Sequence, residues 1–346
     1  MLILSGLIAA SLGLTLFLNQ PSSKSRRVSD YFVVSRGMPS KQIVQRLHSL
    51  GITDSPLILY WSGRILNKWD QVKAGEYSIQ PQDTPLEIFD RLTSGISISR
   101  PFTLNEGKNT YELATLMESR GLGTKKEALE LIRSPDWLLE VGWSGPLPPS
   151  AEGYLFPDTY FFTRGTPAKE VLKAMGRRFL EIWTPEFTHV AQKHGFSRHQ
   201  LVTLASMIEK ETGVGFERPM ISSVFHNRLK KRMRLQSDPT TIYGIWETYD
   251  GNLRKQDLLT PSPYNTYTLP GLPSGPIGNP GKEALLAALH PESTEYLYFV
   301  SQNDGTHAFT RTYQEHLAAV RVFQLNPKAR EGKSWRDQLK NESPPQ

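Results

Sequence analysis

The sequence contains no cysteine, and this absence excludes several classes of function at once. Without cysteine the chain cannot form a disulfide, a thiolate metal site or a cysteine nucleophile. It also cannot carry the acylated cysteine of a lipoprotein anchor. His226, His290 and His307 lack the spacing of metal ligands, so we expect these histidines to be structural and expect no metal site.

Long runs of like charge are also missing. The formal net charge is +6 and is spread along the chain, which suits an anionic lipid surface or an acidic polymer as a partner. No block of basic and aromatic residues stands out, so the composition does not favour nucleic acid. At 346 residues the chain is long enough for about two domains and a sizeable core.

One long apolar run is present, because the segment from Leu2 to Leu18 carries no charge. A helix of this length spans roughly 25 Å at about 1.5 Å per residue, slightly less than a ~30 Å hydrocarbon core. We expect a membrane anchor over residues 1–20. A cleaved signal peptide is the alternative, although no basic segment precedes the run. Lys24, Arg26 and Arg27 follow it, which by the positive-inside rule favours a cytoplasmic body.

The remaining patterns predict an α+β fold, because helices and short strands mix without repeated βαβ units. From Tyr31 to Ile79 the order is strand, helix, helix and strand. The segment from Thr260 to Gly281 is rich in proline and glycine but carries YNTY, so we expect an ordered loop. The expected parts are an anchor over 1–20, a linker over 21–30, a first module over 31–100, a connecting region over 101–149, a mixed α+β domain over 150–325 and a polar tail over 326–346.

The stretch LVTLASMIEKETG, which ends at Gly213, contains the main catalytic candidates. Ser197 and Gln200 have the spacing of a capping box, which predicts that a helix begins near Ser197. Gly213 is expected to end it. The apolar stripe of this helix comprises Leu201, Leu204, Ala205 and Ile208.

The two acids of this stretch are expected to lie on different sides of the helix. Glu211 is about 20° around the axis from Leu204 at ~100° per residue, whereas Glu209 is roughly 140° away and should face solvent. Burial and the negative end of the helix dipole would both raise the pKa of Glu211. A protonated acid at neutral pH is what general-acid cleavage of a glycosidic bond needs. The alternative is a buried glutamate that pairs with Arg228 or Arg234.

Four segments of the chain carry a more specific signal. They read EGYLFPDTYFF, then LASMIEKETG with FERPMISSVFHNRLKKRMRLQSDPTTIYG, then TPSPYNTYTLPGLPSGPIGNPG, then ALHPESTEYLYFV. In order and spacing they resemble the MltG (YceG-like) family of endolytic murein transglycosylases. The resemblance implies a LysM-like first module, an inner-membrane anchor with the body outside the cytoplasm, and Glu211, the second acid of EKET, as the catalytic residue. Two departures are Ser274, where the family usually has a second proline, and the basic cluster, which here follows the apolar run.

The resemblance also implies a reaction. The substrate would be a peptidoglycan glycan strand, cut between N-acetylmuramic acid and N-acetylglucosamine. The C6 hydroxyl of the muramic acid attacks C1, and Glu211 acts first as acid and then as base, which leaves a 1,6-anhydro end and would terminate strand elongation. No metal or organic cofactor is required, and wall synthases are candidate partners.

Other polar residues are candidates for substrate binding. Gln236 and Asp238 could orient acetamido groups or stabilise positive charge, and the alternative for Asp238 is to cap a turn. Tyr264, Asn265 and Tyr267 could stack on sugars and bond to them, and the alternative is an internally packed loop. Two other functions stay open at this point. One is hydrolysis, with Asp238 positioning a water, and the other is a membrane-anchored glycan-binding scaffold in which the EKET helix is structural.

Overall fold

The computed structural model describes residues 12–13, 15–21, 31–35, 37–80, 83–211 and 213–326. In this described part of the chain, no helix is long and apolar enough to cross a membrane. The larger part of the predicted anchor, most of the predicted linker and nearly all of the predicted tail lie outside the described residues.

The chain forms two compact units, which we describe separately. Unit 1 comprises Met1–Phe102, Glu118–Gly123 and Thr159–Pro167. Unit 2 comprises Thr103–Met117, Thr124–Asp158 and Ala168–Gln346. The module expected over 31–100 therefore falls within unit 1, and the candidate acids fall within unit 2. The predicted domain boundaries stay predictions.

Unit 1 begins with the predicted order of strand, helix, helix and strand. The elements are β1 (Phe32–Val34), α2 (Ser40–Ser49), α3 (Pro56–Ile65) and β2 (Gly75–Tyr77), followed by α4 (Pro85–Ser94). β1 and β2 pair antiparallel, with Phe32 opposite Tyr77. Their buried faces and the apolar faces of the three helices enclose one core, which includes Leu47, Leu59 and Phe89. A short 3-10 helix, Trp69–Gln71, joins α3 to β2.

Helix α4 shows how the local sequence fixes these elements. Thr84 and Glu87 form a capping box at its start, and Pro85 occupies the first turn, where a missing N–H costs nothing. Gly95 ends the helix in the left-handed region with φ of 75°, a conformation that is unfavourable for residues with a Cβ atom. A second small sheet pairs β3 (Arg100–Thr103) with β4 (Thr159–Phe162).

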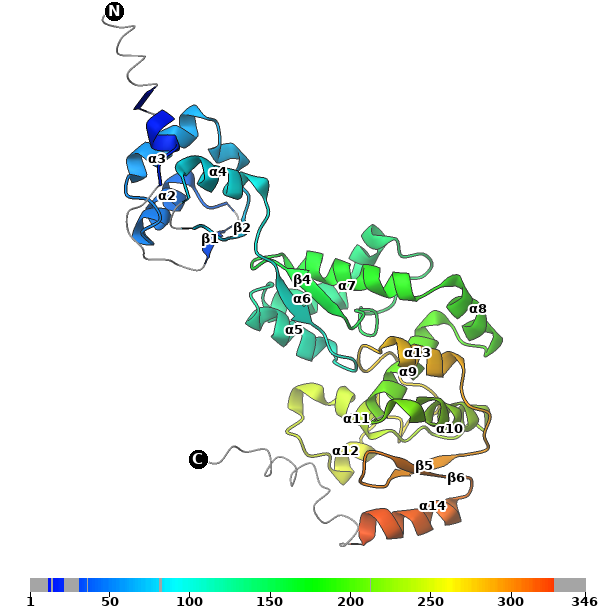
Figure 1. The fold of residues 1–346 in the computed structure, drawn as a ribbon. Helices are drawn as coiled ribbons and strands as arrows, with labels where there is room; N and C mark the ends of the chain where they lie inside the picture. The colour runs from blue at the N-terminus through cyan, green and yellow to red at the C-terminus, as the bar shows by residue number, and fades with distance from the viewer. Residues whose placement is uncertain are drawn as a thin grey trace, which may run out of the picture. The chain divides into compact units, whose positions relative to one another are not determined.

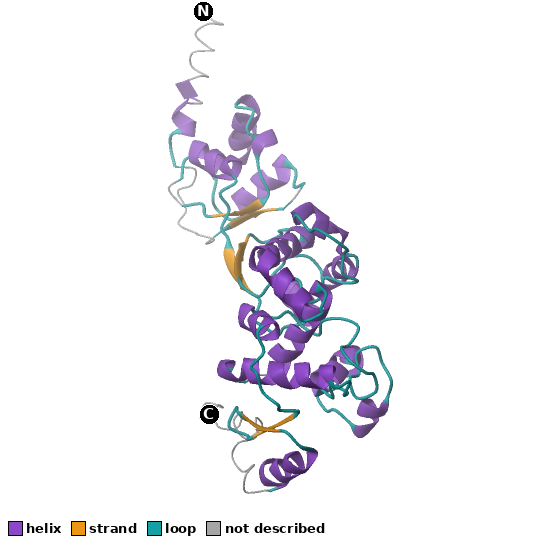
Figure 2. Cartoon of the chain, turned by 90° about the vertical axis from the view of Figure 1, so that its right-hand side faces the viewer, coloured by secondary structure: helices purple, strands orange, loops and turns teal. Residues whose placement is uncertain are grey.

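Helices form most of unit 2 (Figure 2). They are α5 (Thr110–Ser119, whose last two residues belong to unit 1), α6 (Lys125–Arg133), α7 (Ala168–Ile182), α8 (Pro185–Lys193), α9 (Arg198–Glu211), α10 (Arg218–Lys230), α11 (Asp238–Gly244), α12 (Lys255–Leu259), α13 (Lys282–Leu289) and α14 (Tyr313–Val320). Short turns of other helical types lie at Pro135–Val141, Gly215–Glu217, Trp246–Thr248 and Arg321–Leu325.

The strands of unit 2 that bear on the candidate site are β5 (Tyr298–Ser301) and β6 (His307–Thr310), which pair antiparallel with Phe299 opposite Phe309. The described part of the chain therefore contains three two-stranded sheets among many helices. This confirms the predicted α+β class. Helix α9 lies at the centre of unit 2 and contacts α8, α10, α11 and α13 (Figure 1).

Candidate active site

Helix α9 positions both candidate acids, and its predicted start is confirmed. Ser197 N donates to Gln200 Oε1 at 2.9 Å, and Gln200 N donates to Ser197 Oγ at 3.2 Å, which is the reciprocal pattern of a capping box. All residues from Leu201 to Glu209 are buried. The helix is therefore covered on every side for most of its length.

The prediction that Glu209 faces solvent is wrong. Its side chain is 5% exposed, and its Oε1 atom accepts from Nη2 of Arg218 at 2.9 Å. Its Oε2 atom accepts from the N–H of Gly281, the residue before α13, at 2.9 Å. The helical period places Glu209 away from the apolar stripe, but neighbouring helices cover that side of α9 too. Glu209 is thus a buried, ion-paired acid that joins α9 to the starts of α10 and α13.

Glu211 ends α9 in a different environment. The residue keeps part of its surface accessible, and its Oε1 atom accepts a hydrogen bond from Ser237 Oγ at 2.5 Å. Burial of the carboxyl group raises its pKa, and the charge of Asp238 adds to the rise. The Ser237 hydroxyl and the charges of His307 and Arg228 oppose the rise without cancelling it. The predicted rise in the pKa of Glu211 is therefore present, and its largest cause is burial.

The alternative in which Glu211 pairs with an arginine is not what the structure shows. Arg228 is buried, and its guanidinium donates to the backbone carbonyls of Leu297, at 2.6 Å, and of Leu235, at 2.7 Å. Arg234 donates to the carbonyl of Tyr267 at 3.0 Å. Among the described residues neither arginine forms an ion pair with Glu211, so the partner of this acid is a neutral hydroxyl.

Ser237 owes its place to the loop that was predicted to be ordered. Its backbone N–H donates to Oγ1 of Thr266 at 2.9 Å, and Oγ1 of Thr240 donates to the Ser237 carbonyl at 2.6 Å. The two threonine hydroxyls lie 2.8 Å apart in a hydrogen bond. Gln236, just before Ser237, has φ of 49°, an uncommon conformation for a residue with a side chain. The turn that presents Ser237 to Glu211 is thus held by buried hydrogen bonds.

Of the residues predicted to bind sugar, three lie in the turn and loop beside Glu211. Asp238 is exposed, and its Oδ1 atom accepts from the hydroxyl of Tyr267 at 2.6 Å. Burial is the largest cause of the rise in the pKa of Tyr267, and the charges of Asp238 and Glu211 add to that rise. The side chain of Gln236 is exposed next to this group. Asp238 is also the first residue of α11, so its predicted turn-capping alternative stays compatible with the structure.

Tyr264 and Asn265 are used inside the loop. The amide of Asn265 is buried and donates to the carbonyls of three residues, Asp257, Leu258 and Thr260, while its oxygen accepts from Thr241 and from the N–H of Tyr267. The ring of Tyr264 lies 4.7 Å from that of Tyr243. For these two residues the structure favours the alternative of an internally packed loop, and their sugar-binding role stays a prediction.

The sequence did not indicate two groups that act on Glu211, the hydroxyl of Ser237 and His307, which was expected to be structural. Ser237 stands between two residues that were named, Gln236 and Asp238, and a small hydroxyl gives no signal of its own. His307 comes from β6, where Glu217 accepts from its backbone N–H at 2.9 Å and bonds its Nδ1 atom at 2.7 Å. A pairing between positions 90 residues apart cannot be seen in a local pattern.

A further buried acid, Glu152, lies in the aromatic-rich EGYLF segment of unit 2. Its Oε2 atom accepts from the N–H and hydroxyl of Thr110, at 3.0 and 2.7 Å, and from the hydroxyl of Tyr243 at 2.8 Å. Burial raises the pKa of Glu152 to about 7. The oxygen of Asn279 accepts from the backbone N–H groups of Gly153 and Leu155, so this acid and this amide together hold the segment.

Two of the histidines form contacts that hold the fold. His226 bonds to the carbonyl of Ala288 at 3.0 Å, and His307 bonds to Glu217. No group of three or more acids and histidines among the described residues could hold a metal ion. The expectation that no cofactor is needed stays a prediction.

Comparison with known proteins agrees with the motifs. A family model described as the YceG-like family matches residues 32–322. A protein of Bacillus subtilis (strain 168) named endolytic murein transglycosylase is 35% identical over 267 residues, which are 72% of this chain and 73% of that protein. A protein of the same name from Streptococcus pneumoniae serotype 2 (strain D39) is 26% identical over 321 residues, and this chain spans only 57% of its length. The crystal structure of a YceG-like protein from Listeria monocytogenes matches with a TM-score of 0.56 and 29% identity, over 83% of this chain and 98% of that one.

Proposed function

This chain belongs to the YceG-like family, and from that premise we propose that it is a peptidoglycan lytic transglycosylase that cuts glycan strands endolytically. Two relatives carry the name endolytic murein transglycosylase. The observation in this chain that supports the proposal is the environment of Glu211. Its carboxyl group is buried enough to have a raised pKa, part of the residue is accessible, and a neutral hydroxyl is its hydrogen-bond partner.

The proposed reaction uses this acid twice. Glu211 gives its proton to the glycosidic oxygen as the bond from C1 of N-acetylmuramic acid to that oxygen breaks. The C6 hydroxyl of the same sugar attacks C1 and returns its proton to the carboxylate. The products are a 1,6-anhydro end and a free hydroxyl on N-acetylglucosamine, with no water consumed. Intramolecular attack gains from high effective molarity, provided the sugar is held in a reactive conformation.

The surroundings of Glu211 support each half of this cycle. Burial favours the protonated acid that begins the reaction. The Ser237 hydroxyl favours the carboxylate that is formed midway, because it donates to Oε1. Asp238, with the Tyr267 hydroxyl bonded to it, supplies a nearby negative charge that would stabilise positive charge at C1.

Product masses test the reaction. The purified protein is incubated with glycan strands, and the fragments are separated and weighed. We expect new ends that carry 1,6-anhydro-N-acetylmuramic acid. Each such fragment is lighter than the corresponding fragment with a reducing end by the mass of one water, about 18 Da. Fragments with reducing muramic acid ends would replace this proposal by hydrolysis, with Asp238 as the residue that positions water. Binding without cleavage would replace it by the glycan-binding scaffold.

We also propose that the body lies on the outer face of the cytoplasmic membrane, where it would end strands as a wall synthase extends them. An apolar run from Leu2 to Leu18 supports an anchor. In unit 1, Phe17 at the end of this run packs on the core, and helix α3 exposes Leu57, Trp61 and Ile65 on one face, which an adjacent lipid surface would cover. A reporter fused to the C-terminus that is active only in the cytoplasm would contradict this orientation.

The same lipid contact can be tested on α3 directly. Because the chain has no cysteine, Trp61→Cys and the control Arg46→Cys each create one labelling site for an environment-sensitive fluorophore. With the full chain in lipid nanodiscs, we expect quenching by brominated lipid at position 61 and none at position 46. Equal quenching at the two positions, or none at either, would contradict the contact.

The first module is proposed to be LysM-like and to help hold the glycan. The support is its strand, helix, helix and strand order, with β1 paired to β2. Unaltered binding of long strands by a folded protein that lacks residues 31–95 would contradict this role.

A further inference from the structure

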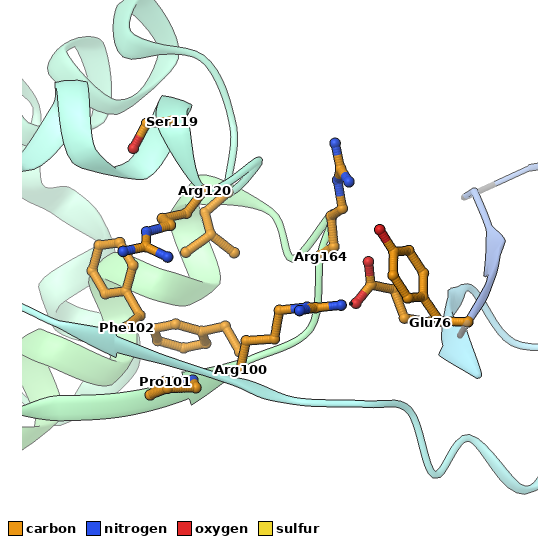
Figure 3. Close-up of a pocket in the computed structure, with 10 residues that line it drawn as sticks. Glu76, Arg100, Pro101, Phe102, Ser119, Arg120 and Arg164 are labelled. Carbon is orange, nitrogen blue, oxygen red and sulfur yellow. Dashed lines mark hydrogen bonds and ion pairs between the residues drawn. The ribbon is translucent and has the colours of Figure 1, made fainter. Parts of the chain in front are cut away.

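A pocket of about 240 Å³ lies within unit 1, away from the acids of α9 in the sequence and lined by different residues (Figure 3). The segments that form it are the residue before β1, strand β2, strands β3 and β4 with the residues that follow β4, and the turn after α5. Its polar lining consists mainly of Glu76 and three arginines, Arg100, Arg120 and Arg164. Phe102 and Phe162 form an apolar wall, with ring centroids 5.9 Å apart.

The three arginines differ in their ion pairing. Arg100 donates from Nε to Glu76 Oε2 at 3.0 Å, and its guanidinium lies 5.0 Å from the ring centroid of Tyr31. Arg120 and Arg164 form no ion pair with any described residue. With three positive charges and one negative charge, the lining carries an excess of about two positive charges at neutral pH.

The backbone brings Arg120 and Arg164 into neighbouring positions. Gly165 N donates to the carbonyl of Gly121 at 3.0 Å, which joins the segment after β4 to the turn after α5. The side chain of Arg164 lies against Gly121, where an added Cβ would be 3.4 Å from its Cγ and Nε atoms. Both arginines line the same pocket, so an anion bound there would be attracted to both guanidinium groups.

Glu76 supplies an independent sign of a missing ligand. The residue is completely buried in β2, and only its Oε2 atom is paired. Its Oε1 atom is buried and has no hydrogen-bond partner in the described part of the chain. A buried carboxylate oxygen without a donor is costly, and such oxygens are rarely left so. The occupant of this pocket should therefore bring an N–H or O–H donor as well as anionic groups.

These requirements select a ligand class. Inorganic phosphate would satisfy the arginines and, through the O–H of its protonated forms, Glu76, but it would leave the wall of Phe102 and Phe162 uncovered. An acidic peptide carries carboxylates for Arg120 and Arg164, an amide or ammonium donor for Glu76, and small apolar groups for the phenylalanine wall. We propose that this pocket binds an acidic peptide, and, on the basis of the proposed function, that this peptide is the stem peptide of the glycan strand that the enzyme cuts.

The test compares strands that keep their stem peptides with strands from which an amidase has removed them. Binding and cleavage are measured with the full-length protein and with a double variant, Arg120→Gln with Arg164→Gln. Both side chains are exposed, so we expect the variant to fold. A matched control, Arg46→Gln with Arg64→Gln, removes the same charge from exposed sites on α2 and α3.

We expect the unmodified protein to bind peptide-bearing strands about tenfold or more tightly than peptide-free strands, as two charge-assisted hydrogen bonds would give. The pocket variant should lose this preference through KM while it cleaves peptide-free strands at the original rate. The control variant should keep the preference. Free stem peptide should compete for binding, and the same peptide with amidated carboxyl groups should not.

Three results would overturn the inference. The first is that the pocket variant prefers peptide-bearing strands as strongly as the unmodified protein does. The second is that the control variant loses this preference to the same extent as the pocket variant, and the third is that inorganic phosphate competes as strongly as the peptide, which would indicate a simple anion site. The proposed function fails separately, because in that case no anhydro ends form from either kind of strand.

Discussion

The two acids at the end of α9 differ in what surrounds them, although only Lys210 separates them. Glu209 has a cation, Arg218, at 2.9 Å and a backbone N–H at 2.9 Å, so both of its oxygens are occupied. Glu211 has one neutral hydroxyl, that of Ser237, and keeps part of its surface accessible. Both acids are surrounded by protein, so burial alone does not distinguish a catalyst from a structural residue. The two acids differ instead in the type of partner, a cation or a neutral hydroxyl, and in whether the residue is accessible from outside.

The comparison has a physical basis. A paired cation attracts the carboxylate and offsets part of the cost of burial, so an acid with such a partner serves the fold. A single hydroxyl offsets that cost only in part, so the acid keeps a raised pKa and can deliver a proton.

The largest effect is expected from Glu211→Gln. Glutamine keeps the shape of the side chain and can accept from Ser237, but it has no proton to give to a leaving oxygen. Loss of general acid catalysis typically costs on the order of 10²–10⁴-fold in rate, and we expect the upper end because the same group also acts as base. The measurement is the rate of formation of anhydro ends, with the thermal unfolding midpoint recorded beside it. The exposed Glu283→Gln is the control, and near-full activity of Glu211→Gln would remove this residue from the mechanism.

Glu209→Gln should produce the opposite result. A solvent-facing Glu209 would make this change nearly silent, but the structure shows that Arg218 would lose the nearer of two acid partners, Glu209 at 2.9 Å, and keep Glu106 at 3.6 Å. Breaking a buried pair by removing one partner costs roughly 3–5 kcal/mol. We expect a lower free energy of unfolding in denaturant titrations, while the folded fraction still cleaves strands. A Glu209→Gln protein as stable as the unmodified one, but unable to cleave, would reverse the roles assigned to the two acids.

A third acid, Glu152, shows the effect of burial without access from solvent. Glu152 has only neutral partners, like Glu211, but is closed off from solvent. Its pKa of about 7 in the folded state lies above the usual 4.5, so between these pH values the folded protein binds more protons than the unfolded chain. Stability should therefore fall as pH rises from 4.5 to 7, by up to about 3 kcal/mol.

Glu152→Gln should remove this part of the pH dependence. Denaturant titrations at pH 4.5 and pH 8 measure it, and the difference in unfolding free energy between the two pH values should be smaller in the variant. The exposed Glu283→Gln should leave that difference unchanged. An equal pH dependence in Glu152→Gln and the unmodified protein would show that the raised pKa of Glu152 contributes nothing to stability.

Local patterns predicted much of the fold and only part of the site. The capping box at Ser197 and the order of strand, helix, helix and strand between Tyr31 and Ile79 depend on residues close in sequence, and the structure confirms them. The position of Glu209 depended on helices that are distant in sequence, so a helical wheel could not show which sides of α9 are covered. A buried helix needs no amphipathic pattern to be a helix.

The remaining contacts of the site also join distant segments. Ser237 meets Glu211 across 26 positions, and Thr266 fixes Ser237 across 29. No periodicity connects such residues, whereas the motif that the family shares does include them. The resemblance therefore predicts Glu211 as the catalytic acid, and the structure shows the groups that affect its pKa.

The smallest effect on the rate is expected from Ser237→Ala, which tests directly how the partner of Glu211 affects its pKa. The hydroxyl donates to Glu211 Oε1 and so stabilises the carboxylate, which lowers the pKa of this acid. Without the hydroxyl that pKa should rise further, and the protonated acid should persist to higher pH. The alkaline limb of the kcat/KM profile on glycan strands should then move to higher pH.

The rate of Ser237→Ala at its optimum should fall only modestly, because a single neutral hydrogen bond contributes about 1 kcal/mol. Thr266→Val is the matched comparison, since it loosens the turn that holds Ser237 and leaves the hydroxyl of Ser237 in place. A purely structural role for Ser237 would lower the rate equally at all pH values in both variants. A displaced alkaline limb in Ser237→Ala alone would show that the neutral partner of Glu211 tunes its pKa, as the contrast with Glu209 requires.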